Sequence, residues 1–334
     1  MQRLYMDNRI DTNEIRIGVV GLGLMGSSVV TALLVAGHRV KAIAPLPGDM
    51  VLAHERILEQ LTHCNKAGLL TEPIDWYLKR MVISEDYANL SNCKVVLECV
   101  IEEMKVKESV YKKITDVTTF DTIIASNTSA IPISCLQKNI PHPERFLGIH
   151  WAEPAYMTRF LEITCGNKTS ARYATWIFEL AHHWGKEPTL LRKDIRGFVT
   201  NRLMYAIYRE MFSLIEKGEA TVEDVDKVFR YDAGSWITLM GIFRRMDFMG
   251  LKDFHQIFEN IFPILCNDEK VPELMQELVK KKLRGTMDAQ GLYPYTAEEA
   301  KEWDEAFALF NEDIYRLAAI YPYDRIDKKS TLKR

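Results

Sequence analysis

Several features that mark specialised classes of protein are scarce or missing in this sequence. The net charge is only −3, from 43 basic and 46 acidic residues, so no basic excess indicates a nucleic-acid partner. No uninterrupted apolar run is long enough to span a membrane. The N-terminal stretch from Met1 to Asp7 lacks the apolar segment of a signal peptide, and acids follow soon after it. This pattern favours a cytoplasmic protein.

Close pairs of cysteines are missing as well. The six cysteines are Cys64, Cys93, Cys99, Cys135, Cys165 and Cys266. Zinc sites and redox motifs depend on pairs of the Cys-x-x-Cys type, whereas scattered cysteines are typical of reduced thiols. We therefore expect no metal site.

What the sequence does contain, up to about residue 190, is an alternation of short β-rich runs and helical stretches. The expected strands are 15–20, 39–44, 81–84, 94–100, 122–126, 146–149, 160–164 and 187–191. The expected helices between them are 26–36, 49–67, 105–117 and 170–184. Alternation of this kind indicates a mostly parallel sheet with helices on both faces.

The second half of the chain reads differently. After Asp194 the strand signals fade, and the helical segments are 197–217, 222–230, 236–246, 254–262, 272–282 and 297–319. A chain of 334 residues is long enough for two domains. We predict an N-terminal tail over 1–13, an α/β domain over 14–193, an all-α domain over 194–322 and a basic tail over 323–334.

A glycine-rich turn follows the first expected strand. Gly21, Gly23 and Gly26 have the spacing Gly-x-Gly-x-x-Gly, with Leu24 and Met25 between the last two, and the turn opens a helix. In this context the glycines allow a tight turn, a close backbone approach to a pyrophosphate, and close packing of helix against strand. The helix N-terminus then faces the phosphates. The pattern predicts a Rossmann-type doubly wound sheet that binds a dinucleotide, followed by the all-α domain.

The second expected strand lacks the carboxylate that usually binds the adenine ribose. Ala44 stands where that acid is expected, and Asp49, five residues further on, reaches the ribose only if the loop folds back. No arginine follows closely enough to indicate a 2′-phosphate. We expect NAD as the cofactor and leave NADP open.

Two residues twelve apart predict the chemistry. His150 ends the apolar run 146–149, and Glu162 lies inside the run 160–163. A carboxylate buried in such a strand is costly unless it has a partner, and an adjacent imidazole is the natural candidate. A histidine held by a glutamate beside a dinucleotide site can move a hydroxyl proton while the cofactor takes the hydride. The pair therefore predicts an oxidoreductase that acts on a CH–OH group.

Six blocks of sequence occur in one order: 21–26, 98–107, 125–129, 145–150, 197–203 and 247–251. With these blocks the chain resembles the L-3-hydroxyacyl-CoA dehydrogenases from about residue 15 to residue 251. The resemblance implies six roles: His150 as general acid and base, Glu162 as the residue that orients it, Ser129 and Asn201 as substrate-binding residues, and Glu102 and Lys107 as residues that line the cofactor and substrate cleft. It also implies a homodimer formed through the helical domain.

Four of these six assignments have a simpler alternative. Ser129 could cap the helix that follows it, and Asn201 could cap or pack within its own helix. Glu102 and Lys107 could be solvated surface charges. The aromatic and methionine-rich stretch 236–248 could be a dimer interface or an intramolecular core.

Three features depart from the pattern of the family. Glu153 adds a negative charge where the family usually has a neutral asparagine. Arg244 and Arg245 stand in an otherwise apolar stretch, where they could bind a carboxylate or a phosphate, or form a surface ion-pair face. The chain beyond Gly285 is longer than a short acyl-CoA enzyme needs, and in this it is similar to the L-gulonate 3-dehydrogenase and L-carnitine dehydrogenase branch.

Three functions follow from these observations. The first is interconversion of an L-3-hydroxyacyl-CoA and a 3-ketoacyl-CoA, with fatty acid metabolism as its setting. The second keeps the chemistry but uses a small free 3-hydroxy acid, which Arg244, Arg245 and the long C-terminus favour. The third is a dinucleotide-binding module without catalysis, suggested by Ala44 and Glu153. An acid–base pair beside a cofactor site argues against the third function.

Overall fold

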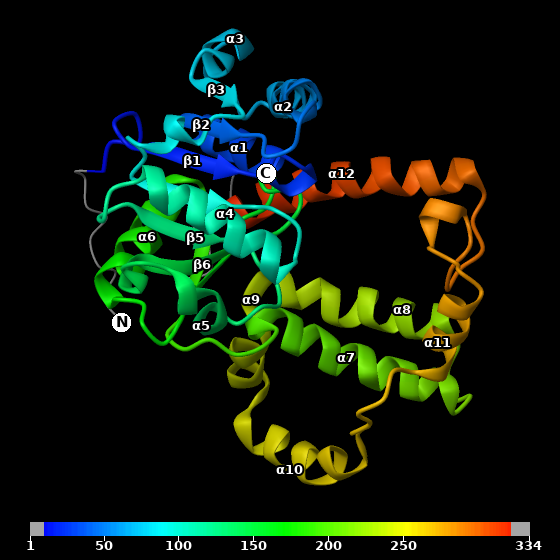
Figure 1. The fold of residues 1–334 in the computed structure, drawn as a ribbon. Helices are drawn as coiled ribbons and strands as arrows, with labels where there is room; N and C mark the ends of the chain where they lie inside the picture. Colours follow the sequence, from blue (N-terminus) through cyan, green and yellow to red (C-terminus); the bar gives the residue numbers. More distant parts are fainter. Residues whose placement is uncertain (1–9, 322–334) are drawn as a thin grey trace. The chain divides into compact units, whose positions relative to one another are not determined.

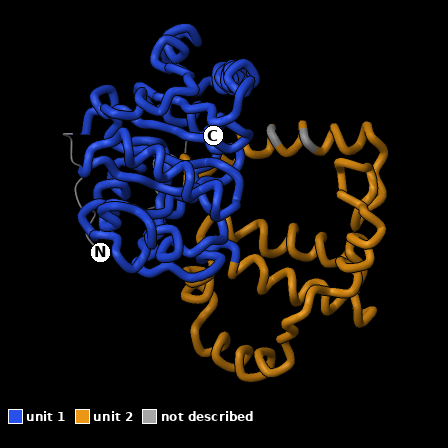
Figure 2. Tube along the Cα trace, in the orientation of Figure 1, with its two compact units in different colours: residues 1–201 blue, residues 202–334 orange. Residues whose placement is uncertain are grey.

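The computed structural model of the protein describes residues 10–321, apart from the side chains at 304 and 308. The chain divides into two compact units, residues 1–201 and residues 202–334 (Figure 2). The division falls a few residues beyond the predicted boundary between 193 and 194. Most of the predicted tail over 1–13 and all of the basic tail over 323–334 lie outside the described residues.

The first unit is built on one sheet, which has eight strands among the described residues. They are β1 (Arg16–Val20), β2 (Arg39–Ile43), β3 (Met81–Ser84), β4 (Val95–Glu98), β5 (Ile123–Ser126), β6 (Phe146–Trp151), β7 (Phe160–Cys165) and β8 (Glu187–Leu191). Their order across the sheet is β3-β2-β1-β4-β5-β6-β7-β8. Figure 1 labels β1, β2, β3, β5 and β6. Strands β1 to β6 are parallel, β7 is antiparallel to β6, and β8 is parallel to β7. The predicted α/β class is confirmed.

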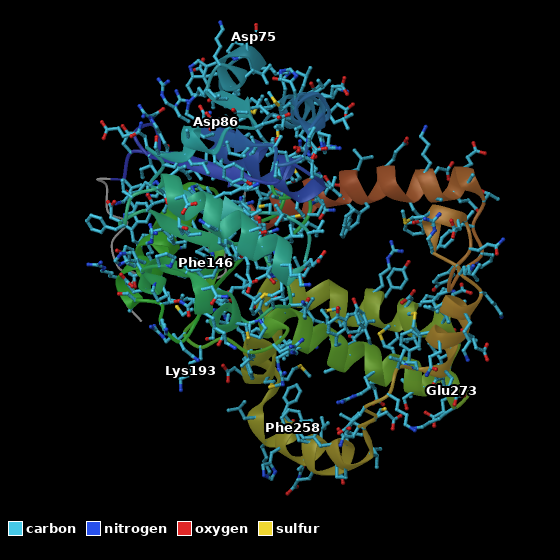
Figure 3. All side chains as sticks on the ribbon, in the orientation of Figure 1. Asp75, Asp86, Phe146, Lys193, Phe258 and Glu273 are labelled. Carbon is cyan, nitrogen blue, oxygen red and sulfur yellow. The ribbon has the colours of Figure 1, made fainter. Side chains whose placement is uncertain are left out.

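Helices pack on both faces of this sheet. They are α1 (Leu24–Val35), α2 (Asp49–Lys66), α3 (Ile74–Leu78), α4 (Met104–Val117), α5 (Ile133–Leu136) and α6 (Ala171–His183), with short 3-10 turns at Tyr87–Leu90, Gln137–Asn139 and Pro143–Arg145. Alternate strand residues enter two separate cores, because successive side chains of a strand point to opposite faces. Ile17 and Val19 of β1 join the core under α1, α2 and α6. Val20 and Phe146, which is labelled in Figure 3, join the core under α4 and α5.

The topology gathers several loops at one edge of the sheet. Because β1, β4, β5 and β6 are parallel, their carboxyl ends meet there. After β1 the chain continues into the turn at Gly21. The strands β4, β5 and β6 end at Glu98, Ser126 and Trp151. The strand order reverses between β1 and β4, and ligands of open α/β sheets bind at such a switch point.

The second unit is helical, as predicted. Its helices are the greater part of α7 (Phe198–Glu216), then α8 (Val222–Val228), α9 (Gly234–Met249), α10 (Leu251–Ile261), α11 (Glu273–Lys280) and α12 (Ala297–Ile320), with a π-helical turn at Phe229–Ala233 and 3-10 turns at Phe262–Ile264 and Thr286–Asp288. Thr221 and Thr296 begin α8 and α12 with capping boxes. Of the described residues in this unit, only Ser213 and Ala300 are buried. No helix within residues 10–321 combines the length and the apolar character needed to cross a bilayer.

Candidate active site

His150 and Glu162 face each other across the β6–β7 ladder. They are direct register partners in this antiparallel pair. The Nδ1 atom of His150 lies 3.2 Å from Oε2 of Glu162. The Glu162 side chain is 1% exposed and the His150 side chain 14% exposed. With Nδ1 engaged by the carboxylate, Nε2 is the ring nitrogen left for a substrate.

The second oxygen of Glu162 is held by the start of α7. Oε1 accepts hydrogen bonds from the backbone nitrogens of Val199 at 3.0 Å and Thr200 at 3.4 Å. These first-turn N–H groups have no partner within the helix, and the helix N-terminus favours a negative charge. The rings of Phe160 and Phe198 lie beside the imidazole, with centroids 5.5 Å and 6.0 Å away. Glu162 is therefore fixed by α7 and in turn fixes the histidine ring.

Ser129 and Asn201 lie next to each other. The Asn201 side chain donates a 2.8 Å hydrogen bond from Nδ2 to the backbone oxygen of Ser129. The contact uses one amide N–H and leaves the other, and Ser129 itself is exposed. Because of this contact, the hydrogen bonds of the Asn201 side chain are not confined to its own helix. Ser129 does not cap α5, because that helix follows Pro132 and has no side-chain cap.

Asn127 and Thr128 shape the turn that carries Ser129. Oδ1 of Asn127 accepts a 3.0 Å hydrogen bond from the backbone nitrogen of Trp151, next to His150. The Thr128 hydroxyl accepts from the Ile131 nitrogen at 2.9 Å and donates to a carboxylate oxygen of Glu102. Neither residue was predicted as part of the site, although both lie inside the block 125–129. Their positions could have indicated this role, because short polar side chains that follow a buried strand commonly bond to nearby backbone groups.

Lys107 is the centre of a buried polar network at the end of β4. Its side chain is 1% exposed, and Nζ lies 2.8 Å from Oε1 of Glu98 and 3.1 Å from Oε2 of Glu102. Glu98 also accepts hydrogen bonds from the Tyr111 hydroxyl at 2.6 Å and the Ser126 hydroxyl at 2.8 Å. Burial and the Glu98 carboxylate raise the pKa of Tyr111 well above its ordinary value. Lys107 is therefore not a solvated surface charge. Its ammonium group contacts Glu102, and Glu102 is the member of the pair that reaches solvent.

The glycine turn has the shape that a pyrophosphate needs. A Cβ atom on Gly26 would lie 1.8 Å from the backbone oxygen of Gly21, and Gly21 has a φ of +94°. A Cβ atom on Gly23 would meet no protein atom within 4 Å. Gly23 precedes the first helical residue, Leu24, and no side chain caps the helix there. The fold itself thus requires Gly21 and Gly26, whereas the space at Gly23 opens toward the helix N-terminus, as a bound phosphate requires. Met25, predicted as a cofactor contact, follows in the first turn of α1.

The end of β2 carries no carboxylate. β2 ends at Ile43, and the next residue, Ala44, is fully buried. Asp49 begins α2 after Gly48, whose left-handed conformation turns the chain into the helix. The ribose contact common in this fold is therefore absent from the described residues of this strand.

Glu153 lies three residues beyond His150 and is half-buried. Its Oε2 atom is buried and has no hydrogen-bond partner among the described residues. Burial raises the pKa of Glu153 to about 7, against the opposing effect of a hydrogen bond from Ser28 of α1. The Ser28 hydroxyl also accepts a 2.7 Å hydrogen bond from the Ala155 nitrogen. The loop after His150 is thus tied to the helix that opens at the glycine turn.

Arg244 and Arg245 lie on α9 in the second unit. The guanidinium of Arg245 lies 5.3 Å from the centre of the Trp236 ring. A contact of either arginine with a substrate stays a prediction. No residue of α9 is buried, and Phe243 and Phe248 are 82% and 73% exposed. The stretch 236–248 therefore does not form a buried core within the second unit.

All six cysteines are free thiols. Burial raises the pKa of Cys64 to about 12 and that of Cys93 to about 11, so both are neutral near pH 7. Within residues 10–321, no three His, Cys, Asp or Glu side chains are grouped to hold a metal ion.

The doubly wound sheet, the glycine turn and the His150–Glu162 pair lie together in the first unit and fit the class of dinucleotide-dependent oxidoreductases. Two family models agree with this class. The NAD-binding domain of 3-hydroxyacyl-CoA dehydrogenase matches residues 16–195, and the C-terminal domain of the same family matches residues 197–295. The chain belongs to the 3-hydroxyacyl-CoA dehydrogenase family, which confirms the resemblance seen in the sequence.

Known relatives act on different substrates. The chain is 30% identical over 286 residues to 5-formyl-3-hydroxy-2-methylpyridine 4-carboxylate 5-dehydrogenase of Mesorhizobium japonicum, covering 85% of this chain and 92% of the relative. A crystal structure of a dehydrogenase of that name, described as an NAD⁺-dependent dismutase, matches with a TM-score of 0.85 at 29% identity, covering 91% of this chain and 98% of that chain. 3-Hydroxybutyryl-CoA dehydrogenase of Mycobacterium tuberculosis is 30% identical over 283 residues, 84% of this chain and 98% of the relative. L-Carnitine dehydrogenase of Oceanobacillus iheyensis is 30% identical over 278 residues, 81% of this chain and 89% of the relative.

Proposed function

We propose that the protein is an NAD-dependent dehydrogenase in which His150 is the general acid and base. The observation that supports this most directly is the His150–Glu162 pair at the sheet edge that also carries the glycine turn. In alcohol oxidation, Nε2 of His150 takes the hydroxyl proton, and Glu162 accepts the hydrogen bond from Nδ1–H and stabilises the imidazolium. NAD, when bound, supplies the hydride acceptor. In the reverse direction His150 returns the proton to the carbonyl oxygen.

Nine further residues complete this proposal. The Ser129 hydroxyl and the remaining N–H of Asn201 donate hydrogen bonds to the substrate oxygen, where charge changes during the reaction. The backbone of Gly21, Gly23, Leu24, Met25 and Gly26 holds the pyrophosphate, with Gly23 at the closest approach. Glu102, supported by Lys107, lines the cofactor cleft from the end of β4.

Two substrate classes fit this chemistry. The first is an L-3-hydroxyacyl-CoA, because the names of the family and of the 3-hydroxybutyryl-CoA dehydrogenase relatives refer to such thioesters. A small free acid is the second, supported by the names of the pyridine-carboxylate and carnitine relatives and by the TM-score of 0.85. In the second case, we propose that Arg244 or Arg245 binds the substrate carboxylate.

A substrate panel separates the two classes. NADH absorbance is followed with acetoacetyl-CoA, free acetoacetate, a sugar keto-acid and 5-formyl-3-hydroxy-2-methylpyridine-4-carboxylate. Turnover of the thioester alone supports the acyl-CoA enzyme, and turnover of an acid alone supports the free-acid enzyme. Binding of NADH without turnover of any of these compounds or of their alcohols supports the non-catalytic module instead. His150→Gln should lower turnover of the active substrate by about 100-fold or more without changing the Kd for NADH. A fully active variant would refute the mechanism.

We also propose that the protein forms a homodimer through the second unit. The support is physical, because a unit of this length with only two buried residues among those described cannot be stable through its own core. Phe243 and Phe248 on α9, and Phe262 beyond α10, are large apolar side chains that solvent reaches. Sedimentation equilibrium tests the proposal, and a monomer at micromolar concentration would contradict it.

A further inference from the structure

The guanidinium of Arg56 lies against the glycine turn. Arg56 is on α2, and its Nη1 donates a 2.8 Å hydrogen bond to the backbone oxygen of Leu22. The same oxygen accepts a 2.9 Å hydrogen bond from the Ser27 hydroxyl of α1. One turn further along α2, Gln60 accepts a 2.7 Å hydrogen bond from Thr31 of α1. The helix that carries Arg56 is therefore fixed against the helix that opens at the turn.

The turn that Arg56 contacts lies beside β2. The Gly21 nitrogen donates a 2.9 Å hydrogen bond to the oxygen of Ile43, so the turn lies beside the end of that strand. In Rossmann sheets this strand end meets the adenosine half of the cofactor, through the acid that binds the ribose. Ala44 occupies the position of that acid here. A cation thus lies near a strand end where an anion is usual.

The charge of Arg56 has no acidic partner among the described residues, and its contact with Leu22 is to a neutral carbonyl. Arg56 is partly buried. A guanidinium has five N–H donors, and the Leu22 oxygen uses only one. The positive end of the α1 dipole lies at the same turn. Two positive elements at one turn, without a counter-charge, favour the binding of an anion there.

We propose that Arg56 binds a phosphate of the dinucleotide on its adenosine side. The proposal rests on the dinucleotide site of the proposed function and adds a residue that sets which phosphates the site takes. The planar fork of arginine suits a phosphate, to which it can bond in bidentate fashion. The phosphate is either in the pyrophosphate, which NAD and NADP share, or the 2′-phosphate of NADP. The sequence did not indicate Arg56, because it lies twelve residues beyond Ala44 and returns to the turn only through the packing of α2.

Binding of NADH and NADPH, followed by nucleotide fluorescence, tests the proposal without catalysis. We expect Arg56→Gln to raise the Kd about tenfold or more, the usual size of a lost charged hydrogen bond, and Arg56→Lys to recover part of the loss. Lys66→Gln is the matched control, since Lys66 is exposed about 15 Å further along the same helix. A loss with both cofactors assigns Arg56 to the pyrophosphate, and a loss with NADPH alone assigns it to the 2′-phosphate. Unchanged Kd values for both would overturn the proposal.

Competition by ADP, 2′-AMP and adenosine separates a phosphate contact from a change in the shape of the turn. A phosphate contact weakens ADP or 2′-AMP in Arg56→Gln and leaves adenosine unchanged. Equal weakening of all three would mean that Arg56 only shapes the turn through Leu22, which overturns the proposal. Wild-type protein that binds neither NADH nor NADPH would instead refute the dinucleotide site itself, so the two failures are distinguishable.

Discussion

Glu162 accepts hydrogen bonds from two different parts of the fold, and one of its partners is His150. Strand pairing places the two side chains opposite each other, with Nδ1 and Oε2 3.2 Å apart. The first N–H groups of α7 hold the other carboxylate oxygen. The orientation of the imidazole is thus set by backbone geometry on both sides of the carboxylate. A histidine fixed in this way presents the same nitrogen to every substrate.

Glu162→Gln tests this coupling. A glutamine oxygen still accepts from Val199, but the amide nitrogen that replaces Oε2 is a donor and cannot accept from His150. We expect kcat to fall by about 100-fold or more while the Kd for NADH stays within about twofold. Glu187→Gln, at an exposed position of β8, is the control and should be neutral. Activity close to wild type in Glu162→Gln would mean that Glu162 does not orient the acid–base residue.

Two alanine substitutions in the glycine turn should both weaken NADH binding but differ in their effect on the Tm. Gly26→Ala places a methyl group 1.8 Å from the Gly21 oxygen, so the turn must move, and we expect a lower Tm together with weaker NADH binding. Gly23→Ala meets no protein atom, so we expect an unchanged Tm. Its added methyl stands where the pyrophosphate approaches, and the Kd for NADH should rise about tenfold or more. Calorimetry and fluorescence titration measure the two effects, and normal NADH binding by Gly23→Ala would place the phosphates elsewhere.

The sheet and the contact between His150 and Glu162 could be predicted from the sequence because both depend on local pattern. Apolar runs gave β3 and β8 their exact bounds, 81–84 and 187–191. A carboxylate inside an apolar strand led directly to His150. The short helices α3 at Ile74–Leu78 and α5 at Ile133–Leu136 could not be given bounds, since segments of one turn have no periodicity to recognise. The roles of Glu98, Tyr111 and Arg56 depend on contacts between distant elements, which a single sequence does not reveal.

The network around Lys107 gives a prediction about stability. Lys107→Met leaves the Glu98 carboxylate fully buried without its cation, and loss of one partner of a buried ion pair costs about 3–5 kcal/mol. Tyr111→Phe removes one of several hydrogen bonds to Glu98 and should cost about 1.5–3 kcal/mol. Lys112→Met, at an exposed position of the same helix, is the control and should cost little. Denaturant unfolding measures these differences, and equal stabilities of Lys107→Met and Lys112→Met would contradict the role of the network.

Glu153 should make the stability of the protein depend on pH in an unusual direction. Burial raises its pKa from the ordinary 4.5 to about 7, so between these values the native state keeps a proton that the unfolded chain has lost. The native state is therefore penalised as pH rises from about 4.5 to about 7, and the penalty is constant above that range. Glu153→Gln removes the titrating group while keeping its shape. We expect equal Tm values for the variant and the wild type at pH 4 and a Tm higher in the variant by a few degrees, about 2–4 °C, at pH 8. Lys186, whose pKa burial lowers to about 7, is present in both proteins and cancels in the comparison. A difference in Tm that does not change between pH 4 and pH 8 would show that Glu153 does not carry this proton.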